Sequence, residues 1–228
     1  MNNRFYTTLL LFFLCSVFSE QVCARNTAVA DKRLMTEWVL SDIIGLKDNS
    51  IKVVGHPRTI DSQFGKAILF NGKKDGIFFK NMPLSGLEQF TIEVIFRPDY
   101  NGKFEQRFFH SGEVYGERVL LETRTTSTDW YLDAYIKSGN NEVILIDSNL
   151  VHPLGQWYNV AFVIDKGKLA TYVNGIKELE GQLDLVPILS GKTSVGVRQN
   201  KLSWFRGAIY KIRISPKALE PDYFMKFQ

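Results

Sequence analysis

The fold is decided by two adjacent segments, WYNVAFVID at residues 157–165 and LATYVNG at residues 169–175. Apolar residues alternate with other residues in both segments, which favours β-strands, and Lys166-Gly167 between them is typical of a turn. In a two-layered sandwich, Phe162 and its alternate neighbours would pack between the sheets. Asn174-Gly175 supplies the positive φ angles of a tight hairpin.

Similar short β-rich runs recur along the rest of the chain and are separated by Gly- and Asn-containing turns. They lie at residues 90–97, 119–124, 130–137, 142–146, 194–198 and 208–214. Many short strands with turns between them predict one all-β domain, an antiparallel sandwich or barrel. Helical turns are expected only near Ser41 to Gly45 and after Pro216, where Ala218 to Phe227 is expected to end the chain as a helix.

The N-terminus predicts export. Arg4 precedes the apolar run Phe5 to Phe18, and Val22-Cys23-Ala24 is typical of a signal-peptide cleavage site. A membrane anchor is the alternative, but the run is shorter than the roughly 20 apolar residues that a spanning helix needs. We therefore expect a signal peptide at 1–24, a short lead at 25–34 and the domain at 35–228, with a secreted or periplasmic location and no membrane span after cleavage.

Composition excludes several functional classes. The chain has 228 residues, 45% of them hydrophobic, and a formal net charge of +4. Its basic residues are scattered, which is not the pattern of a nucleic-acid-binding surface. Both cysteines, Cys15 and Cys23, lie in the predicted signal peptide, so the mature chain has no disulfide or thiol chemistry. No phosphate loop, dinucleotide fingerprint or zinc-like spacing is present.

Four segments in the right order resemble laminin G-like domains of the concanavalin A-like lectin/glucanase superfamily. They are AILFNG at residues 67–72, FTIEVIFRP at 90–98, the hairpin at 157–175 and FRGAIYKIRI at 205–214. The resemblance implies a jelly-roll sandwich of two antiparallel sheets, one of them with a concave, ligand-binding outer face. It also implies a superfamily whose members bind sugars, bind proteins or cleave polysaccharides.

Polar and aromatic residues at alternate strand positions are the candidate ligand contacts. Aromatic rings stack on sugars, and carboxylates and guanidinium groups form paired hydrogen bonds with hydroxyls or acidic sugars. Alternating charges of this kind are also common on a solvated sheet face with cross-strand ion pairs. The candidates are Glu93, His110, Arg118, Glu122, Arg124, Tyr131, Asp133, Tyr135, Arg198 and Trp204.

These residues favour a non-catalytic, glycan-binding or adhesion domain. The alternative is a polysaccharide-cleaving enzyme, but the chain lacks the E-x-D-x-x-E spacing of jelly-roll glucanases. A lyase would need a base and a neutralising group, for which Gln106, Arg107 and His110 with Tyr131 or Tyr135 are the candidates. A protein partner is a third alternative.

No cofactor is expected. Calcium is the usual metal of the superfamily, and Asp75, or Asp99 with Asn101, could contribute to a site. The sequence does not indicate one, because no dense run of acidic residues is present.

Overall fold

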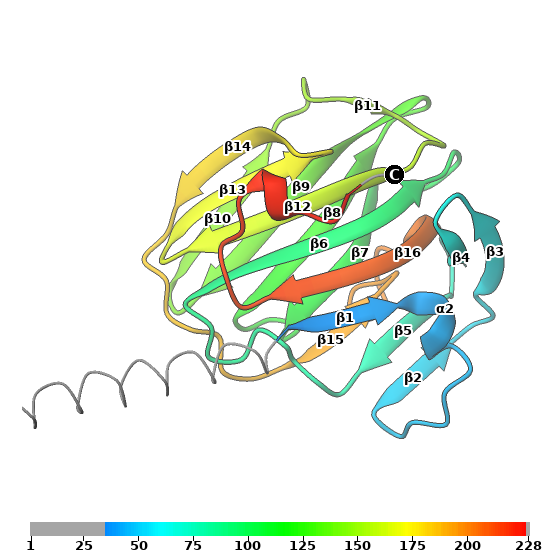
Figure 1. Ribbon diagram of the computed structural model, residues 1–228, viewed down its shortest axis with the longest axis horizontal. Coiled ribbons are helices and arrows are strands. Elements are labelled where there is room, and N and C mark those ends of the chain that lie inside the picture. The colour runs from blue at the N-terminus through cyan, green and yellow to red at the C-terminus, as the bar shows by residue number, and fades with distance from the viewer. Residues whose placement is uncertain (1–34, 227–228) are drawn as a thin grey trace, which may run out of the picture. The chain divides into compact units, whose positions relative to one another are not determined.

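The computed structural model describes residues 35–226. The predicted signal peptide and lead therefore lie outside the described residues. From Thr36 onward the described chain forms one compact unit built of two antiparallel sheets (Figure 1). This confirms the predicted all-β sandwich. No helix among the described residues is long and apolar enough to cross a membrane.

We call the two layers the front sheet and the back sheet, after their places in Figure 1. The front sheet has the order β14 (Ile176–Gln182), β13 (Lys168–Val173), β12 (Tyr158–Asp165), β6 (Gln89–Pro98), β16 (Arg206–Ser215), β4 (Gly65–Asn71) and β3 (Arg58–Ser62), with β1 (Thr36–Val39) paired to β16. The back sheet has the order β10 (Asn141–Ile146), β9 (Asp129–Ser138), β8 (Arg118–Thr125), β7 (Glu105–Gly112), β15 (Lys192–Val195), β5 (Gly76–Phe79) and β2 (Ile51–Val54), with β11 (His152–Pro153) paired to β9.

The hairpin predicted from residues 157–175 forms as β12 and β13 of the front sheet. Its two strands pair in antiparallel register from Val160 opposite Val173 to Asp165 opposite Lys168. Asn174 and Gly175 have φ angles of 51° and 80°, as a tight turn requires. Phe162 is fully buried between the sheets. The segment that decided the fold in the sequence is thus a core hairpin of the sandwich.

The core lies between the two layers and is centred on aromatic rings. Phe96 of β6 stacks on Phe108 of β7 at 4.5 Å and meets Trp130 of β9 edge-on at 5.1 Å, measured between ring centroids. Full burial of such side chains stabilises the fold by about 1.5–3 kcal/mol each. Because both sheets supply rings to one cluster, the layers cannot slide without breaking it.

Helix is confined to two short turns. The helix α2 (Leu40–Ile43) lies within one residue of the turn predicted near Ser41. The predicted C-terminal helix is wrong, because residues 218–226 contain only the 3₁₀ turn η1 (Pro221–Tyr223). This segment instead packs on the outside of the front sheet, where Phe224 covers Ala161 and Val163 of β12. Tertiary packing of Phe224 and Met225 therefore overrides local helix preference.

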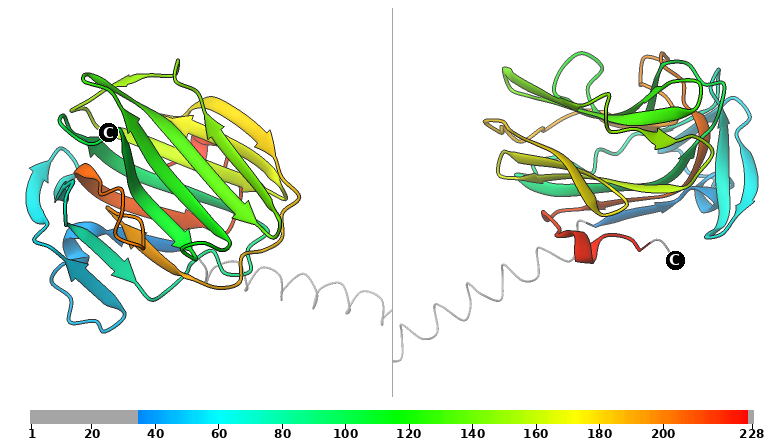
Figure 2. Two further views of the ribbon diagram at one scale, coloured as in Figure 1. Left: turned by 180° about the vertical axis from the view of Figure 1, so that it is seen from behind. Right: turned by 90° about the horizontal axis from the view of Figure 1, so that it is seen from above.

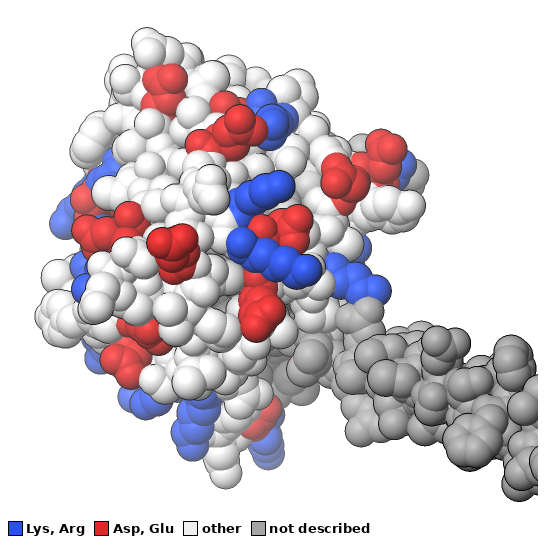
Figure 3. Space-filling view, turned by 90° about the vertical axis from the view of Figure 1, so that its left-hand side faces the viewer, with Lys and Arg blue, Asp and Glu red and all other residues white. Residues whose placement is uncertain are grey.

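The outer faces of the two sheets differ. Seen from above, the C-terminal segment and β1 lie on the front-sheet side, and the back sheet forms the opposite layer (Figure 2). Both ends of the described chain are therefore on the same side of the sandwich. On the flank formed by β10, β13 and β14, basic and acidic side chains are interspersed (Figure 3).

Candidate functional site

One row of paired residues crosses the whole back sheet and identifies its outer face. From β10 to β2 the partners are Ile144, Tyr135, Leu120, His110, Ser194, Phe78 and Lys52. Their neighbours along the strands, such as Val119 and Ile136, belong to the core. Because side chains alternate across a strand, this row and its i±2 neighbours project away from the core. We call this surface the back-sheet outer face.

A β-bulge in β7 places charged residues on this face. The register between β7 and β8 shifts between Arg107 and Phe109, so both Phe108 and Phe109 enter the core. Glu105 and Arg107 before the bulge and His110 after it therefore share the outer face. A bulge commonly re-aims side chains in this way.

Five charged side chains on neighbouring strands form a network that we call the charged cluster. Its members are Glu105, Arg107, Glu122, Arg124 and Asp133. Arg124 donates from Nε to Asp133 Oδ2 at 2.9 Å and from Nη1 to Glu105 Oε2 at 2.5 Å. Arg107 contacts Glu105, and its Nε lies 2.7 Å from Glu122 Oε1. The pairs fix both guanidinium planes in place.

Burial distinguishes this cluster from a solvated sheet face. Glu122 and Asp133 are each 2% exposed and Arg107 is 9% exposed. Ser203, from the loop before β16, covers one side of the charged cluster, and its Oγ donates to Glu105 Oε1 at 2.9 Å. The loop between β15 and β16 therefore covers part of the strands, and the cluster is largely buried beneath it.

The protonation of the cluster follows from this burial. Burial raises the pKa of Glu122 to about 7, against the attraction of Arg107, and the charge of Asp133 raises it further. Burial also raises the pKa of Asp133, although Arg124 opposes the change. The pKa of the half-exposed Glu105 is raised by partial burial, but hydrogen bonds from Arg124 and Arg107 dominate and lower it to about 2. The most accessible carboxyl is therefore always ionised near neutral pH.

Two exposed aromatic rings lie beside arginines of the back-sheet outer face. Phe104 is 59% exposed, and the Arg124 guanidinium lies 5.9 Å from the centroid of its ring. Tyr115, in the loop between β7 and β8, is 78% exposed, and Arg198 lies 5.9 Å from its ring. Large exposed rings next to fixed charges offer both stacking and hydrogen bonding to a ligand.

The predicted histidine does not contact solvent. His110 is fully buried, its Nε2 lies 3.0 Å from the carbonyl oxygen of Glu113, and its Nδ1 accepts from the backbone N–H of Gln199 at 3.2 Å. Burial lowers the pKa of His110 to about 4, and Arg198 is the first of three arginines that lower it further. The ring is neutral and satisfied, so its prediction as a ligand contact is corrected to a structural role.

Glu93 also departs from the predicted set. It lies on β6 of the front sheet and is fully buried under the C-terminal segment. Its Oε1 accepts from the backbone N–H of Met225 at 2.5 Å, and its Oε2 accepts from Arg213 Nε at 2.6 Å. Glu93 is therefore an anchor for the chain end and cannot share a surface with Glu122 or Asp133.

The remaining predicted residues lie on or beside the back-sheet outer face. Arg118 donates from Nη2 to Tyr135 Oη at 3.1 Å, and Tyr135 donates to Glu142 at 2.6 Å. Tyr131 lies opposite Arg124 on β9. Trp204 pairs with Arg107 through an isolated parallel bridge and is half-buried. Figure 2 shows the strands that carry most of these residues side by side in the back sheet.

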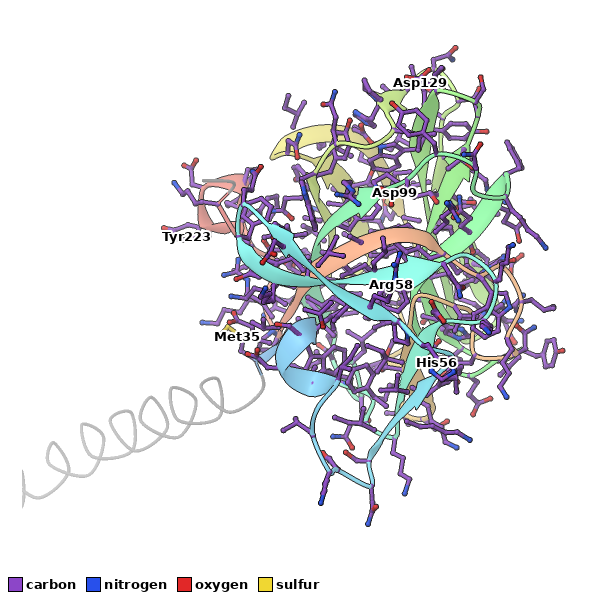
Figure 4. The ribbon with its side chains drawn as sticks, turned by 90° about the vertical axis from the view of Figure 1, so that its right-hand side faces the viewer. Met35, His56, Arg58, Asp99, Asp129 and Tyr223 are labelled. Atoms are coloured by element: carbon purple, nitrogen blue, oxygen red, sulfur yellow. The ribbon has the colours of Figure 1, made fainter. Side chains whose placement is uncertain are left out.

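The acidic residues named as calcium candidates serve other purposes. Asp75 is 2% exposed and accepts the backbone N–H groups of His56 and Asn71, while Asp99 pairs with Arg97 at 2.7 Å. Figure 4 labels His56, whose backbone N–H donates to Asp75, and Asp99. Among residues 35–226, no group of three or more His, Cys, Asp or Glu could hold a metal ion.

Comparison with known proteins agrees with this architecture. A laminin G-type family model, described as the concanavalin A-like lectin/glucanases superfamily, matches residues 71–223, more than half of the chain. The chain belongs to the concanavalin A-like lectin/glucanase superfamily. No curated protein matches it in sequence.

Solved structures share the fold at low sequence identity. Domain 4 of AbnA, an extracellular arabinanase from Geobacillus stearothermophilus in complex with arabinotriose, is 23% identical with a TM-score of 0.59, over 74% of this chain and 79% of that one. The binding domain of botulinum neurotoxin DC in complex with SialylT is 12% identical with a TM-score of 0.56, and the match covers 75% of this chain and 44% of that one. A pentraxin from Limulus polyphemus is 18% identical with a TM-score of 0.53, over 68% and 77%.

Several site residues of this superfamily member could not be found from the sequence. Glu105 precedes a bulge, and the segment EQRFFHSG at residues 105–112 lacks the alternation that marks a half-buried strand, so Glu105 was not named and Arg107 was named only as a lyase candidate. Phe104 and Tyr115 lie in loops. The available sequence signal for this part of the site was an aromatic residue next to a charged one where a loop meets a strand, as at Phe104-Glu105.

Proposed function

We propose that this chain is a secreted, non-catalytic carbohydrate-binding domain whose ligand lies across the back-sheet outer face. The observation that carries the proposal is the exposed ring of Phe104 beside Glu105 and Arg124, whose charged groups are held by buried ion pairs. A sugar ring has an apolar face for stacking and hydroxyls for paired hydrogen bonds. A rigid carboxylate and guanidinium next to an aromatic ring match both features.

Preorganisation supports a binding role over a merely solvated surface. Exposed ion pairs lose side-chain entropy when they form and contribute about 0–1 kcal/mol. Here Arg124 is held by Glu105 and by the buried Asp133 before any ligand arrives. A ligand that contacts Arg124 therefore does not have to order it, which lowers the entropic cost of binding.

Superfamily membership supports the same proposal. The solved structures of similar fold include a domain described in complex with arabinotriose and a toxin binding domain in complex with SialylT. Export rests on the predicted signal peptide at residues 1–24. An extracellular or periplasmic glycan is the corresponding ligand.

The accessibility of the acids supports a non-catalytic role. Glu122, with its raised pKa, would suit a general acid, and Asp133 is its cross-strand partner. However, Glu122 Oε2 and Asp133 Oδ1 are inaccessible to solvent, and the other oxygen of each contacts an arginine. An acid that cannot reach a glycosidic oxygen cannot protonate it.

The geometry also disfavours the lyase alternative. Both ring nitrogens of His110 are engaged by the backbone. Gln106 points away from the cluster and is buried, with its Oε1 accepting the backbone N–H of Arg206 at 2.7 Å. Neither residue is available as a base or as a neutralising group on the outer face.

Gel retention with a panel of neutral and acidic polysaccharides tests the proposal. We expect at least one polymer to retard the protein, and Phe104→Ala to weaken that binding about fivefold, because loss of one stacking ring costs on the order of 1 kcal/mol. The matched control is Tyr223→Ala, since Tyr223 is an exposed aromatic residue on the front-sheet side, 70% exposed against 59% for Phe104. Unretarded migration in every polymer, or equal weakening by both variants, would contradict the proposal.

A further inference from the structure

A lysine-lined pocket lies at the β2–β5 end of the back-sheet outer face. Its cavity of about 410 Å³ is bounded by Lys52, Lys80, Lys192 and Lys201, with Phe78 among the apolar residues of its floor. Lys52 and Phe78 are register partners in the row that crosses the back sheet. The pocket therefore lies on the same outer face of the back sheet as the proposed glycan-binding surface.

None of the four ammonium groups forms an ion pair with a carboxylate of residues 35–226. No acidic residue lines the pocket, and no described carboxylate lies within 4.0 Å of any of the four lysine Nζ atoms. Lys80 interacts electrostatically with Asp48. A hydrogen bond from the backbone N–H of Ser50 is the main cause that lowers the pKa of Asp48, and the charge of Lys80 lowers it by a smaller amount. This contrasts with the interspersed charges on the flank of β10, β13 and β14 (Figure 3).

Two arginines extend the positive charge from the pocket toward the charged cluster. Arg198 donates from Nη2 to the carbonyl oxygen of Val114 at 2.9 Å, and Val114 lines the pocket. Arg118 donates to the carbonyl oxygen of Gly116 at 2.6 Å and to Tyr135. Neither guanidinium has a carboxylate within 4.0 Å among the described residues, and the Nε atom of each is buried without a hydrogen-bond partner.

Two acidic residues in the loop before Arg118 are already engaged. Glu113 accepts from Ser190 Oγ at 2.7 Å, and Glu117 accepts from the backbone N–H of Gly139 at 2.8 Å. Arg198 is destabilised by its surroundings, because burial lowers its pKa and repulsion from Arg107 and Arg118 lowers it further. A bound anion would relieve this repulsion.

The wall of the pocket is rigid. Gln199 donates from its side chain to the carbonyl oxygens of Gly112 at 3.0 Å and Lys192 at 2.6 Å. Lys201 is held in a tight turn with φ of 62°, where its N–H donates to the carbonyl oxygen of Arg198 at 2.8 Å. The loop that carries Arg198 and Lys201 is thus tied to β7 and β15 before any ligand binds.

We propose that the lysine pocket, together with Arg198, binds the carboxylate or sulfate groups of an acidic polysaccharide. The proposal rests on the proposed function, since the rest of the same polymer would cross the charged cluster and Phe104. Concentrated positive charge over an apolar floor complements a sugar that has an anionic substituent and an apolar ring face. A neutral glycan would leave the cations of the pocket unpaired.

The experiment compares three polymers: unsubstituted dextran, dextran sulfate and polygalacturonate. The pocket variant is Lys52→Gln with Lys192→Gln and Lys201→Gln, all exposed lysines without ion pairs. The matched control is Lys73→Gln with Lys74→Gln and Lys168→Gln, which removes the same charge outside the pocket. Dissociation constants are measured by gel retention at two salt concentrations.

We expect at least one acidic polymer to bind more tightly than dextran. The pocket variant should weaken that binding at least tenfold and flatten its salt dependence, while the control variant retains both. If the pocket selects sulfate groups, the pocket variant should lose binding to dextran sulfate. If it selects uronate groups, the pocket variant should lose binding to polygalacturonate.

Three results would overturn the inference. Equal binding of dextran and the acidic polymers, unchanged in the pocket variant, would leave the proposed function standing but remove the acidic ligand. Equal loss in both lysine variants would indicate non-specific attraction to net charge. If no polysaccharide at all bound, including those of the wider panel, the proposed function itself would fail.

Discussion

Glu122 shows how burial alters the chemistry of a single side chain. It lies between Arg107 and Arg124, yet burial holds its pKa near 7. The folded protein therefore retains a proton that the unfolded chain releases above its ordinary pKa of 4.5. Because the native state binds more protons across this interval, stability falls as pH rises from about 4.5 to 7.

Glu122→Gln removes this titration. We expect the variant to gain stability relative to the wild type as pH increases from 5 to 8, by on the order of 3 kcal/mol. Urea unfolding at the two pH values measures the difference. A difference between variant and wild type that is the same at both pH values would contradict the raised pKa.

Single residues also show where sequence reasoning ends. The positions of Arg118, Glu122, Arg124 and Asp133 on one face follow from period two alone. Their burial does not follow, because it depends on the loop that carries Ser203 and closes over Glu105. From the sequence, His110 was a candidate base. Its contacts with the backbone carbonyl of Glu113 and the backbone N–H of Gln199, which the sequence does not reveal, exclude that role.

At the scale of elements, two glycines set how closely β7 and β15 approach. Gly112 and Gly191 have φ angles of 117° and 133°, which L side chains rarely adopt. A Cβ atom at Gly191 would lie 2.1 Å from the carbonyl carbon of Gly112. The β7–β15 pairing positions Lys192 at the lysine pocket, so the close approach of Gly191 to Gly112 also helps to shape that pocket.

We expect Gly191→Ala to destabilise the protein by about 2 kcal/mol or more, through backbone strain and overpacking. Gly45→Ala is the control, because nothing lies within 4 Å of a Cβ there and its φ is not positive. That change should stay within about 0.5 kcal/mol. Thermal unfolding of both variants makes the comparison, and equal midpoints would argue against the close approach.

Elements with strict alternation were predictable, and irregular ones were not. β6, β8, β9, β12 and β16 match the expected runs within a few residues. β7 was missed because its bulge breaks the pattern, and β15 ends at Val195, before the expected Arg198, because the chain leaves the sheet at Gly196. The lysine pocket was invisible, since its cations come from four separate segments of the chain.

At the scale of the whole molecule, stability rests on the core between the sheets. Both cysteines lie outside residues 35–226. We expect the exported protein to begin at Arg25, or at Asp31 if cleavage follows the small-residue segment Ala28-Val29-Ala30 instead, and intact mass spectrometry distinguishes the two. Either product lacks cysteine, so its unfolding midpoint should not change on addition of a reducing agent. A reductant-dependent midpoint, or a mass that includes residues 1–24, would contradict the predicted processing.

The front-sheet location of both described chain ends has a geometric consequence. The C-terminal segment and β1 lie on one side of the sandwich, and the strands β7, β8 and β9, which carry the charged cluster, lie in the opposite layer (Figure 2). A tether, label or fusion partner attached next to Met35 or Lys226 would therefore start on the side of the sandwich away from the proposed binding surface. Immobilised in this way, the protein would present that proposed surface outward as an affinity reagent.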